Sequence, residues 1–151
     1  MLILQKTTKN DPHFLQLVKE LDSNLKVTDG EDHEFYNQYN GLDNIRHILV
    51  GYLDGNPVCC GAFKALEPTV AEIKRMYTRP ETRGRGLAKQ VIKTLEAWAL
   101  SQGIRQLILE TGVNQHAAIA LYTQCGYKRI SNYGPYTGVD GSLCFGKVLI
   151  T

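Results

Sequence analysis

The stretch from Arg83 to Lys89 combines cations and glycines where a strand, a turn and a helix should meet. It follows an alternating apolar run at residues 72–78 and opens an amphipathic run. Glycines let a backbone approach a ligand closely, and a helix N-terminus offers unpaired N–H groups and the positive end of a dipole. These properties predict a cradle for a phosphate or pyrophosphate, formed by Arg83, Gly84, Arg85, Gly86, Leu87, Ala88 and Lys89.

Two common phosphate-binding motifs do not fit this turn. A P-loop places Lys and then Ser or Thr after its last glycine, but Leu87 follows Gly86 here. A dinucleotide fingerprint needs a small residue where Lys89 stands, and it belongs to an early strand–turn–helix unit. The pattern that remains, Arg-x-x-Gly-x-Ala, lies past the middle of the chain.

A second informative segment ends in Ala-Ile-Ala-Leu-Tyr-Thr-Gln-Cys-Gly-Tyr at residues 118–127. Together the two segments resemble the signature of the GNAT superfamily of N-acetyltransferases, whose first motif binds the pyrophosphate of acetyl-CoA. The resemblance extends from Leu2 to Leu149. It implies an α/β (α+β) fold with a mixed, mostly antiparallel sheet of about six to seven strands and about four flanking helices. The fourth and fifth strands are then a parallel pair that splays apart.

The resemblance also implies catalytic roles. Tyr122 matches a tyrosine held near the CoA sulfur, where a phenol can protonate the leaving thiolate or donate a hydrogen bond to it. A protonated amine, with a pKa of about 10, must lose a proton before it attacks, and two carboxylates compete as the base. Glu72 in the fourth strand is slightly preferred to Glu110 at the end of the fifth.

Other residues are implied to bind the two substrates. Backbone N–H groups after a bulge in the fourth strand would hold the acetyl oxygen and the pantetheine arm. Gln115 stands where many members have an asparagine that contacts CoA. The expected acetyl-CoA set is therefore the cradle with Met76, Tyr77, Thr78, Gln115 and Tyr122, and the expected acceptor set is Glu31, His33, Tyr36, Tyr133 and Tyr136. The histidines lack metal-ligand spacing, so no metal is expected.

Hydrophobic spacing and turn residues predict the elements that position these side chains. Asp11 and Pro12 should begin a helix that ends near Ser23, and a capping box from Thr28 should begin a second one that ends near Tyr39. A hairpin turn is expected at residues 54–57. The expected strands are residues 1–5, 46–53, 58–66, 72–78, 107–109, 127–131 and 143–149, and the later helices are residues 86–102 and 117–125.

Composition narrows the class of protein. The 151 residues suit a single domain, here 1–151, and 43% of them are hydrophobic. A net charge of +2 does not favour nucleic acid or a membrane surface as a partner, and no apolar run is long enough to span a bilayer. The cysteines, which include adjacent Cys59 and Cys60, are expected to be reduced in a cytoplasmic protein.

These observations predict an acyltransferase that moves an acetyl group from acetyl-CoA to a primary amine of a small metabolite, directly in a ternary complex. An N-acetyltransferase that acts on a protein N-terminus or a lysine is the alternative within the class. A non-catalytic CoA-binding sensor is an alternative of another class, as is an enzyme that binds ATP or NAD through the cradle. The sequence does not decide between a monomer and a homodimer.

Overall fold

The computed structural model describes residues 1–39 and 41–149, and the side chain of His33 lies outside this description. The seven described strands form one sheet in the order β1-β2-β3-β4-β5-β7-β6. Neighbouring strands are antiparallel except for β4 and β5, which are parallel. In chain order the elements are β1 (Leu2–Thr7), α1 (Pro12–Asp29), η1 (Gly30–Asp32), α2 (His33–Asn37), β2 (His47–Leu53), β3 (Asn56–Glu67), β4 (Val70–Thr78), η2 (Pro80–Thr82), α3 (Leu87–Ser101), β5 (Gln106–Gly112), α4 (His116–Gln124), β6 (Lys128–Ile130), η3 (Gly134–Tyr136) and β7 (Ser142–Val148).

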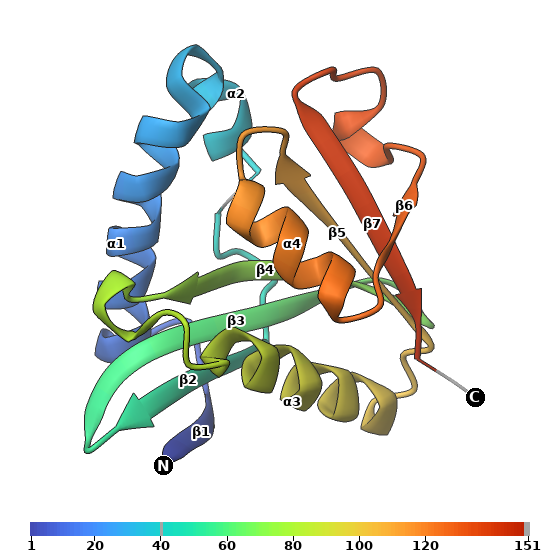
Figure 1. Cartoon of the computed structure of the whole chain (residues 1–151). Helices are drawn as coiled ribbons and strands as arrows, with labels where there is room; N and C mark the ends of the chain where they lie inside the picture. The colour runs from blue at the N-terminus through green and yellow to red at the C-terminus, as the bar shows by residue number, and fades with distance from the viewer. Residues whose placement is uncertain (40, 150–151) are drawn as a thin grey trace.

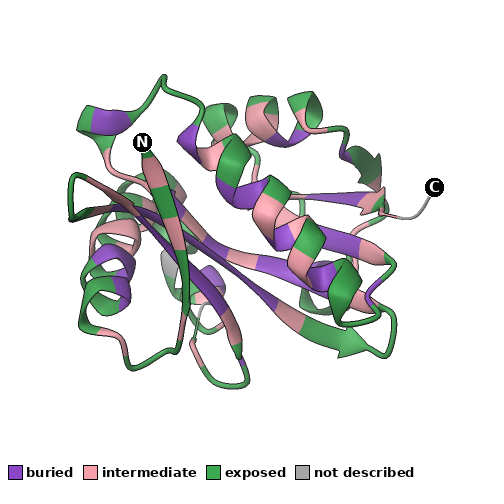
Figure 2. Cartoon of the chain, turned by 90° about the horizontal axis from the view of Figure 1, so that it is seen from below, coloured by how far each residue is buried: buried purple, intermediate pink, exposed green. Residues whose placement is uncertain are grey.

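Helices cover both faces of the sheet (Figure 1). On one face α3 and α4 pack against the strands, with Val91 and Leu95 of α3 fully buried. On the other face α1 packs through Phe14 and Leu17, which are also fully buried. Figure 2 shows buried segments of the central strands beneath helices whose outer faces are exposed. The mixed, mostly antiparallel sheet with its parallel β4–β5 pair confirms the predicted fold class.

Most predicted elements are present, but the prediction for the N-terminal helices is wrong in one respect. α1 continues through Thr28 to Asp29 and does not end at Ser23. The Thr28 hydroxyl donates to the carbonyl oxygen of Asn24 at 3.0 Å, a bond made within a helix, so it does not cap a new one. The helix ends at Gly30, whose φ of +55° favours glycine, and the second helical segment shortens to η1 and α2.

Two features of β4 shape the middle of the sheet. The register of the β3–β4 pair shifts opposite Gly61, and Arg75 has a φ of +57°, so β4 carries a bulge there. Space opposite the bulge is tight, because a Cβ on Gly61 would lie 2.5 Å from the Met76 sulfur and 2.7 Å from a methyl group of Val91 on α3. β4 and β5 pair only from Val70 to Glu72, beyond which both strands continue without pairing to each other. The predicted splay is therefore present.

None of the helices in the described part of the chain has the length and apolar character to cross a bilayer.

Candidate active site

A groove of about 860 Å³ runs along the open end of the splayed strands. Its walls come from α1, the end of β4, the turn before α3, and α4. Almost all residues expected to bind acetyl-CoA line it: Met76, Tyr77, Thr78, Arg83, Gly84, Gly86, Leu87, Ala88, Lys89, Gln115 and Tyr122. Arg85 is the exception and lies in the exposed turn beside the groove.

The turn has the geometry that a bound phosphate group requires. Gly84 and Gly86 have φ values of +82° and +75°, and a Cβ built on either would meet no atom within 4 Å. No side chain caps α3, so the N–H groups of its first turn keep their donor capacity for a ligand. The open space, the free donors and the nearby Arg83 and Lys89 fit the pyrophosphate of acetyl-CoA.

The end of β4 directs the backbone N–H of Thr78 away from β3, on the side of the groove. The N–H of Arg79 donates to the carbonyl oxygen of Val58 on β3 at 2.8 Å. Because ladder hydrogen bonds alternate along an antiparallel strand, the N–H of Tyr77 also faces β3 and that of Thr78 faces away from it. β5 does not pair with β4 at this point, so the outward donor is available to a ligand.

A smaller cavity of about 140 Å³ lies between the splayed strands and adjoins the groove, with Met76, Gln115 and Tyr122 lining both. Glu72 and Glu110 also line this inner cavity. The structure therefore brings together the three side chains that the sequence singled out for catalysis. Gln115 is held in place by its amide, which donates to the Thr28 hydroxyl of α1 at 2.7 Å.

The Tyr122 phenol is buried and keeps its proton. Its side chain is buried, and burial, followed by the nearby Cys125 and Glu110, raises the pKa of its phenol well above the ordinary value. The phenol is therefore protonated at neutral pH. None of the hydrogen bonds among the described residues uses its hydroxyl, which leaves that group available to a ligand.

Glu110 has the properties of a base that works near neutral pH. Burial raises the pKa of its carboxyl from 4.5 to about 7; the charges of Asp29 and Glu72 add to the rise, and the Ser142 hydroxyl and Lys74 oppose it. Its Oε2 is buried and receives no hydrogen bond from the described residues. A carboxylate that is partly ionised at pH 7 and has an unsatisfied oxygen can accept a proton from an amine.

Glu72 is held differently, although it is only 5% exposed. Its Oε2 accepts a hydrogen bond from the Tyr133 hydroxyl at 2.6 Å, and its Oε1 lies 3.3 Å from the Lys74 ammonium. Lys74 also donates to the carbonyl oxygen of Tyr39 at 3.0 Å. Both oxygens of Glu72 are thus engaged, and the carboxylate ties β4 to the loop before β7. This geometry favours Glu110 over Glu72 as the base, the reverse of the order taken from the sequence.

The residues expected around the acceptor divide into two groups. Tyr36 and Tyr136 line the inner cavity, and Tyr133 lines a third cavity, the outer pocket, of about 470 Å³. Glu72, Lys74 and Tyr136 line both the inner cavity and the outer pocket, so the two adjoin. Glu31 is exposed on η1 and lines none of these three cavities. The expectation for His33 falls on a side chain outside the description.

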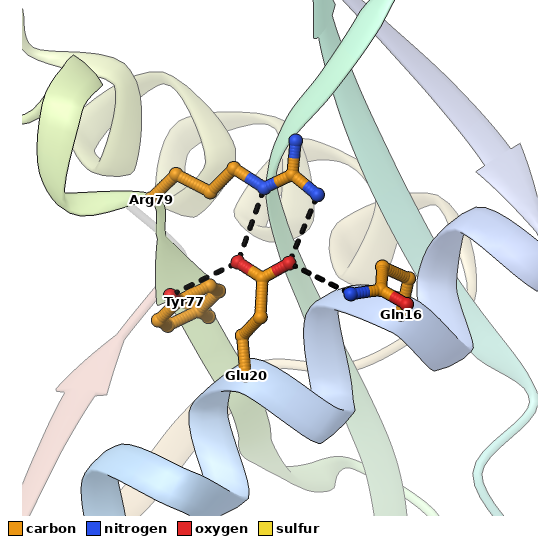
Figure 3. Close-up of polar contacts among 4 residues, drawn as sticks. All are labelled: Gln16, Glu20, Tyr77 and Arg79. Atoms are coloured by element: carbon orange, nitrogen blue, oxygen red, sulfur yellow. Dashed lines mark hydrogen bonds and ion pairs between the residues drawn. The ribbon is translucent and has the colours of Figure 1, made fainter.

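Sequence reasoning did not anticipate how α1 is fixed as a wall of the groove. Glu20 of α1 accepts two hydrogen bonds from the Arg79 guanidinium, at 3.1 and 2.9 Å, and one from the Tyr77 hydroxyl at 3.2 Å. These contacts are drawn in Figure 3. Gln16 donates to the same carboxylate. The Arg79 pairing holds the pKa of Glu20 below its ordinary value. The sequence signal for this cluster was the i, i+4 spacing of Gln16 and Glu20, which predicts that their side chains meet on one face of a helix.

Lys74 is another site residue to which the sequence assigned no role of its own. Lys74 lies two positions from Glu72 on a strand, which places both side chains on one face of the sheet. That spacing was a usable signal for the pair. Asp29 begins the acidic run that the resemblance placed at one wall of the acceptor site, and at the end of α1 it lines the inner cavity.

Comparisons with known proteins agree with this geometry. The family model for the acetyltransferase (GNAT) family matches residues 14–127. An IAA acetyltransferase from Azospirillum brasilense is 34% identical over 125 residues, which are 81% of each chain. A crystal structure from Klebsiella pneumoniae, assigned as an acyl-CoA N-acyltransferase, is 31% identical with a TM-score of 0.84 over 99% of each chain.

A GNAT family acetyltransferase from Elizabethkingia anophelis, crystallised with acetyl-CoA bound, has a TM-score of 0.71 over 97% of each chain. At 16% identity this likeness shows the fold alone. The family match and the two closer likenesses confirm the resemblance carried by the two sequence motifs. The chain therefore belongs to the GNAT family of acetyltransferases and is an acyltransferase.

Proposed function

We propose that the protein transfers the acetyl group of acetyl-CoA to the primary amine of a small molecule while both substrates are bound. The observation that carries this proposal is the junction of the groove with the inner cavity, at which Tyr122 lines both and Glu110 lines the inner one. An activated acyl group and an amine can therefore be bound side by side. Holding two reactants in this way removes much of the entropic part of a bimolecular barrier.

The groove suits acetyl-CoA, which supplies a thioester as the activated acyl group. The N–H groups at the start of α3, with Arg83 and Lys89, would hold the pyrophosphate. The backbone N–H of Thr78 would bind the arm that leads to the thioester. The Tyr122 phenol would donate to the sulfur as it leaves.

The inner cavity suits an amine. Asp29, Glu72 and Glu110 contribute three carboxylates to its walls, and Lys74 and Arg75 contribute two cations. Arg75 is already paired with Asp22 of α1, and Lys74 with Glu72. Glu110 would therefore accept the proton of the entering ammonium group. The positive charge of that group also favours the ionised form of Glu110 and so opposes the effect of burial on the pKa of the carboxyl.

Direct transfer is favoured over an acyl-enzyme. Cys59, Cys60 and Cys144 are buried. Cys125 is partly exposed but lines none of the three cavities, and burial raises the pKa of its thiol, so little reactive thiolate is present. A small acceptor is supported by the size of the inner cavity, about 140 Å³, and by the relative named IAA acetyltransferase.

The proposal is tested by mixing the purified protein with acetyl-CoA and a panel of amines and measuring the release of free thiol. The panel contains amino acids, simple alkyl and aryl amines, polyamines, and peptides with a free N-terminus or a lysine. We expect turnover of small amines that is lost in Tyr122→Phe. Turnover of peptides alone would support a protein acetyltransferase, and acetyl-CoA binding without any turnover would support a sensor.

A further inference from the structure

The outer pocket carries a cation that no described partner neutralises. Lys64 of β3 lines it, is partly buried, and makes no ion pair or hydrogen bond with the described residues. It is the register partner of Glu72 on β4, so the two side chains share one face of the sheet. Lys74, two residues further along β4, lies on the same face.

The charges in the outer pocket are otherwise engaged. Glu72 is bound by Tyr133 and Lys74, and Lys74 is shared with the carbonyl oxygen of Tyr39. Asp43 also lines the pocket, but its side chain is fully exposed and lies 4.0 Å from Lys9. Among the described residues, the charge without a partner in the outer pocket is therefore positive.

The inner cavity has the opposite character, because Glu110 lines it with a buried carboxylate oxygen that receives no hydrogen bond from the described side chains. Glu72, Lys74 and Tyr136 form the wall that the inner cavity and the outer pocket share, and Tyr133 lines the outer pocket. Two adjoining cavities, one with an unsatisfied carboxylate oxygen and the other with an ammonium that no described residue pairs, match a molecule with a cationic and an anionic end.

We propose that the acceptor is a zwitterion, an amino acid or similar molecule, whose amine enters the inner cavity while its carboxylate binds the Lys64 ammonium in the outer pocket. This inference rests on the proposed function and narrows its acceptor class. A carboxylate satisfies the charge of Lys64, and the tyrosines contact the hydrocarbon part of the molecule. Simple amines and polyamines lack the anionic end and leave Lys64 unpaired.

The test uses matched pairs of acceptors with the wild-type protein and acetyl-CoA: phenylalanine with phenethylamine, leucine with isoamylamine, and methionine with 3-(methylthio)propylamine. Each pair differs by one carboxylate. Because a hydrogen bond to a charged group contributes a factor of about ten or more, we expect kcat/KM to favour the amino acid by at least about tenfold in at least one pair.

Lys64→Met is the test variant, and Lys128→Met, an exposed strand lysine that lines none of the cavities, is its matched control. We expect Lys64→Met to lower kcat/KM for the amino acid by about tenfold and to leave its carboxylate-free partner unchanged. The ratio within a pair does not depend on the fraction of folded protein, so a loss of stability cannot imitate this result.

The outcomes separate the two proposals. If the carboxylate-free amines, or peptides, are acetylated as well as the amino acids or better, the zwitterion inference is wrong and the acetyltransferase function stands. If Lys64→Met lowered kcat/KM equally for both members of a pair, Lys64 would not bind the carboxylate of the acceptor. If acetyl-CoA binds and no acceptor releases thiol, the proposed function fails and the inference fails with it.

Discussion

Glu110→Gln should remove the base and at the same time stabilise the protein at alkaline pH. Burial raises the pKa of this carboxyl from 4.5 to about 7, so the folded state holds the proton to a higher pH than the unfolded chain. Below pH 4.5 both states are protonated and Glu110 costs no stability. As the pH rises toward 7, the unfolded chain releases its proton first, and the free energy of unfolding falls.

The size of the effect follows from the shift. At about 1.4 kcal/mol for each unit of pKa, the ionised carboxylate destabilises the fold by less than about 1 kcal/mol at pH 5 and by about 3 kcal/mol at pH 8. Glutamine has the same shape and no charge, so the variant should avoid this loss. We expect the difference in unfolding free energy between the Gln variant and the wild type to grow by about 2 kcal/mol from pH 5 to pH 8.

Urea unfolding at several pH values measures this difference, with Glu67→Gln as the control because Glu67 is exposed on the end of β3. The same proteins serve for kinetics. The wild-type kcat/KM should rise with pH to a plateau above about pH 7, where Glu110 is ionised. The Gln variant should be slower by about 10²–10⁴-fold and should lack this acidic limb.

Parallel stability curves for the wild type and Glu110→Gln would refute the environment that we assign to Glu110. A Gln variant that kept the acidic limb would refute its role as the base. If Glu72→Gln were the variant that lost the limb, the role would pass to Glu72. If neither variant altered the profile, the amine would enter in its neutral form and the enzyme would act by positioning.

Three further predictions concern the groove and the bulge. Gly86→Val should weaken acetyl-CoA binding by about tenfold or more in a calorimetric titration, because bulk at the start of α3 removes at least one charged contact with the phosphate. Gly103→Val, at the other end of α3, has the same left-handed strain and open surroundings and should not weaken binding. Equal losses in the two variants would place the phosphate elsewhere. Tyr122→Phe should lower kcat by about 10²–10⁴-fold with little change in acetyl-CoA affinity, because its hydroxyl matters as charge develops on sulfur; full activity would leave Tyr122 as a packing residue. Gly61→Ala should lower the free energy of unfolding by about 1–3 kcal/mol, because its Cβ would meet the Met76 sulfur at 2.5 Å, and an unchanged urea midpoint would contradict the tight contact.

Local sequence determined most of the elements and the glycine turn before α3. The Asp54–Gly55 hairpin forms where the turn residues predicted it, with positive φ at both positions. α3 begins at Leu87, directly after the predicted glycine turn, and α4 carries Tyr122 as its motif implied. Such features follow from conformational preference and hydrophobic period over a few neighbouring residues, so they can be predicted without knowledge of the tertiary structure.

Tertiary structure decided which carboxylate is left with an unsatisfied oxygen and a raised pKa, the properties on which our choice of base rests. Glu72 and Glu110 are both strand glutamates, and nothing in their own neighbourhoods in the sequence separates them. The hydroxyl of Tyr133, 61 positions away in the sequence, donates a hydrogen bond to the Glu72 carboxylate. Burial and the charge of Asp29 raise the pKa of Glu110. Burial and charge depend on groups that only the folded chain brings together, so the sequence could name both candidates but could not rank them.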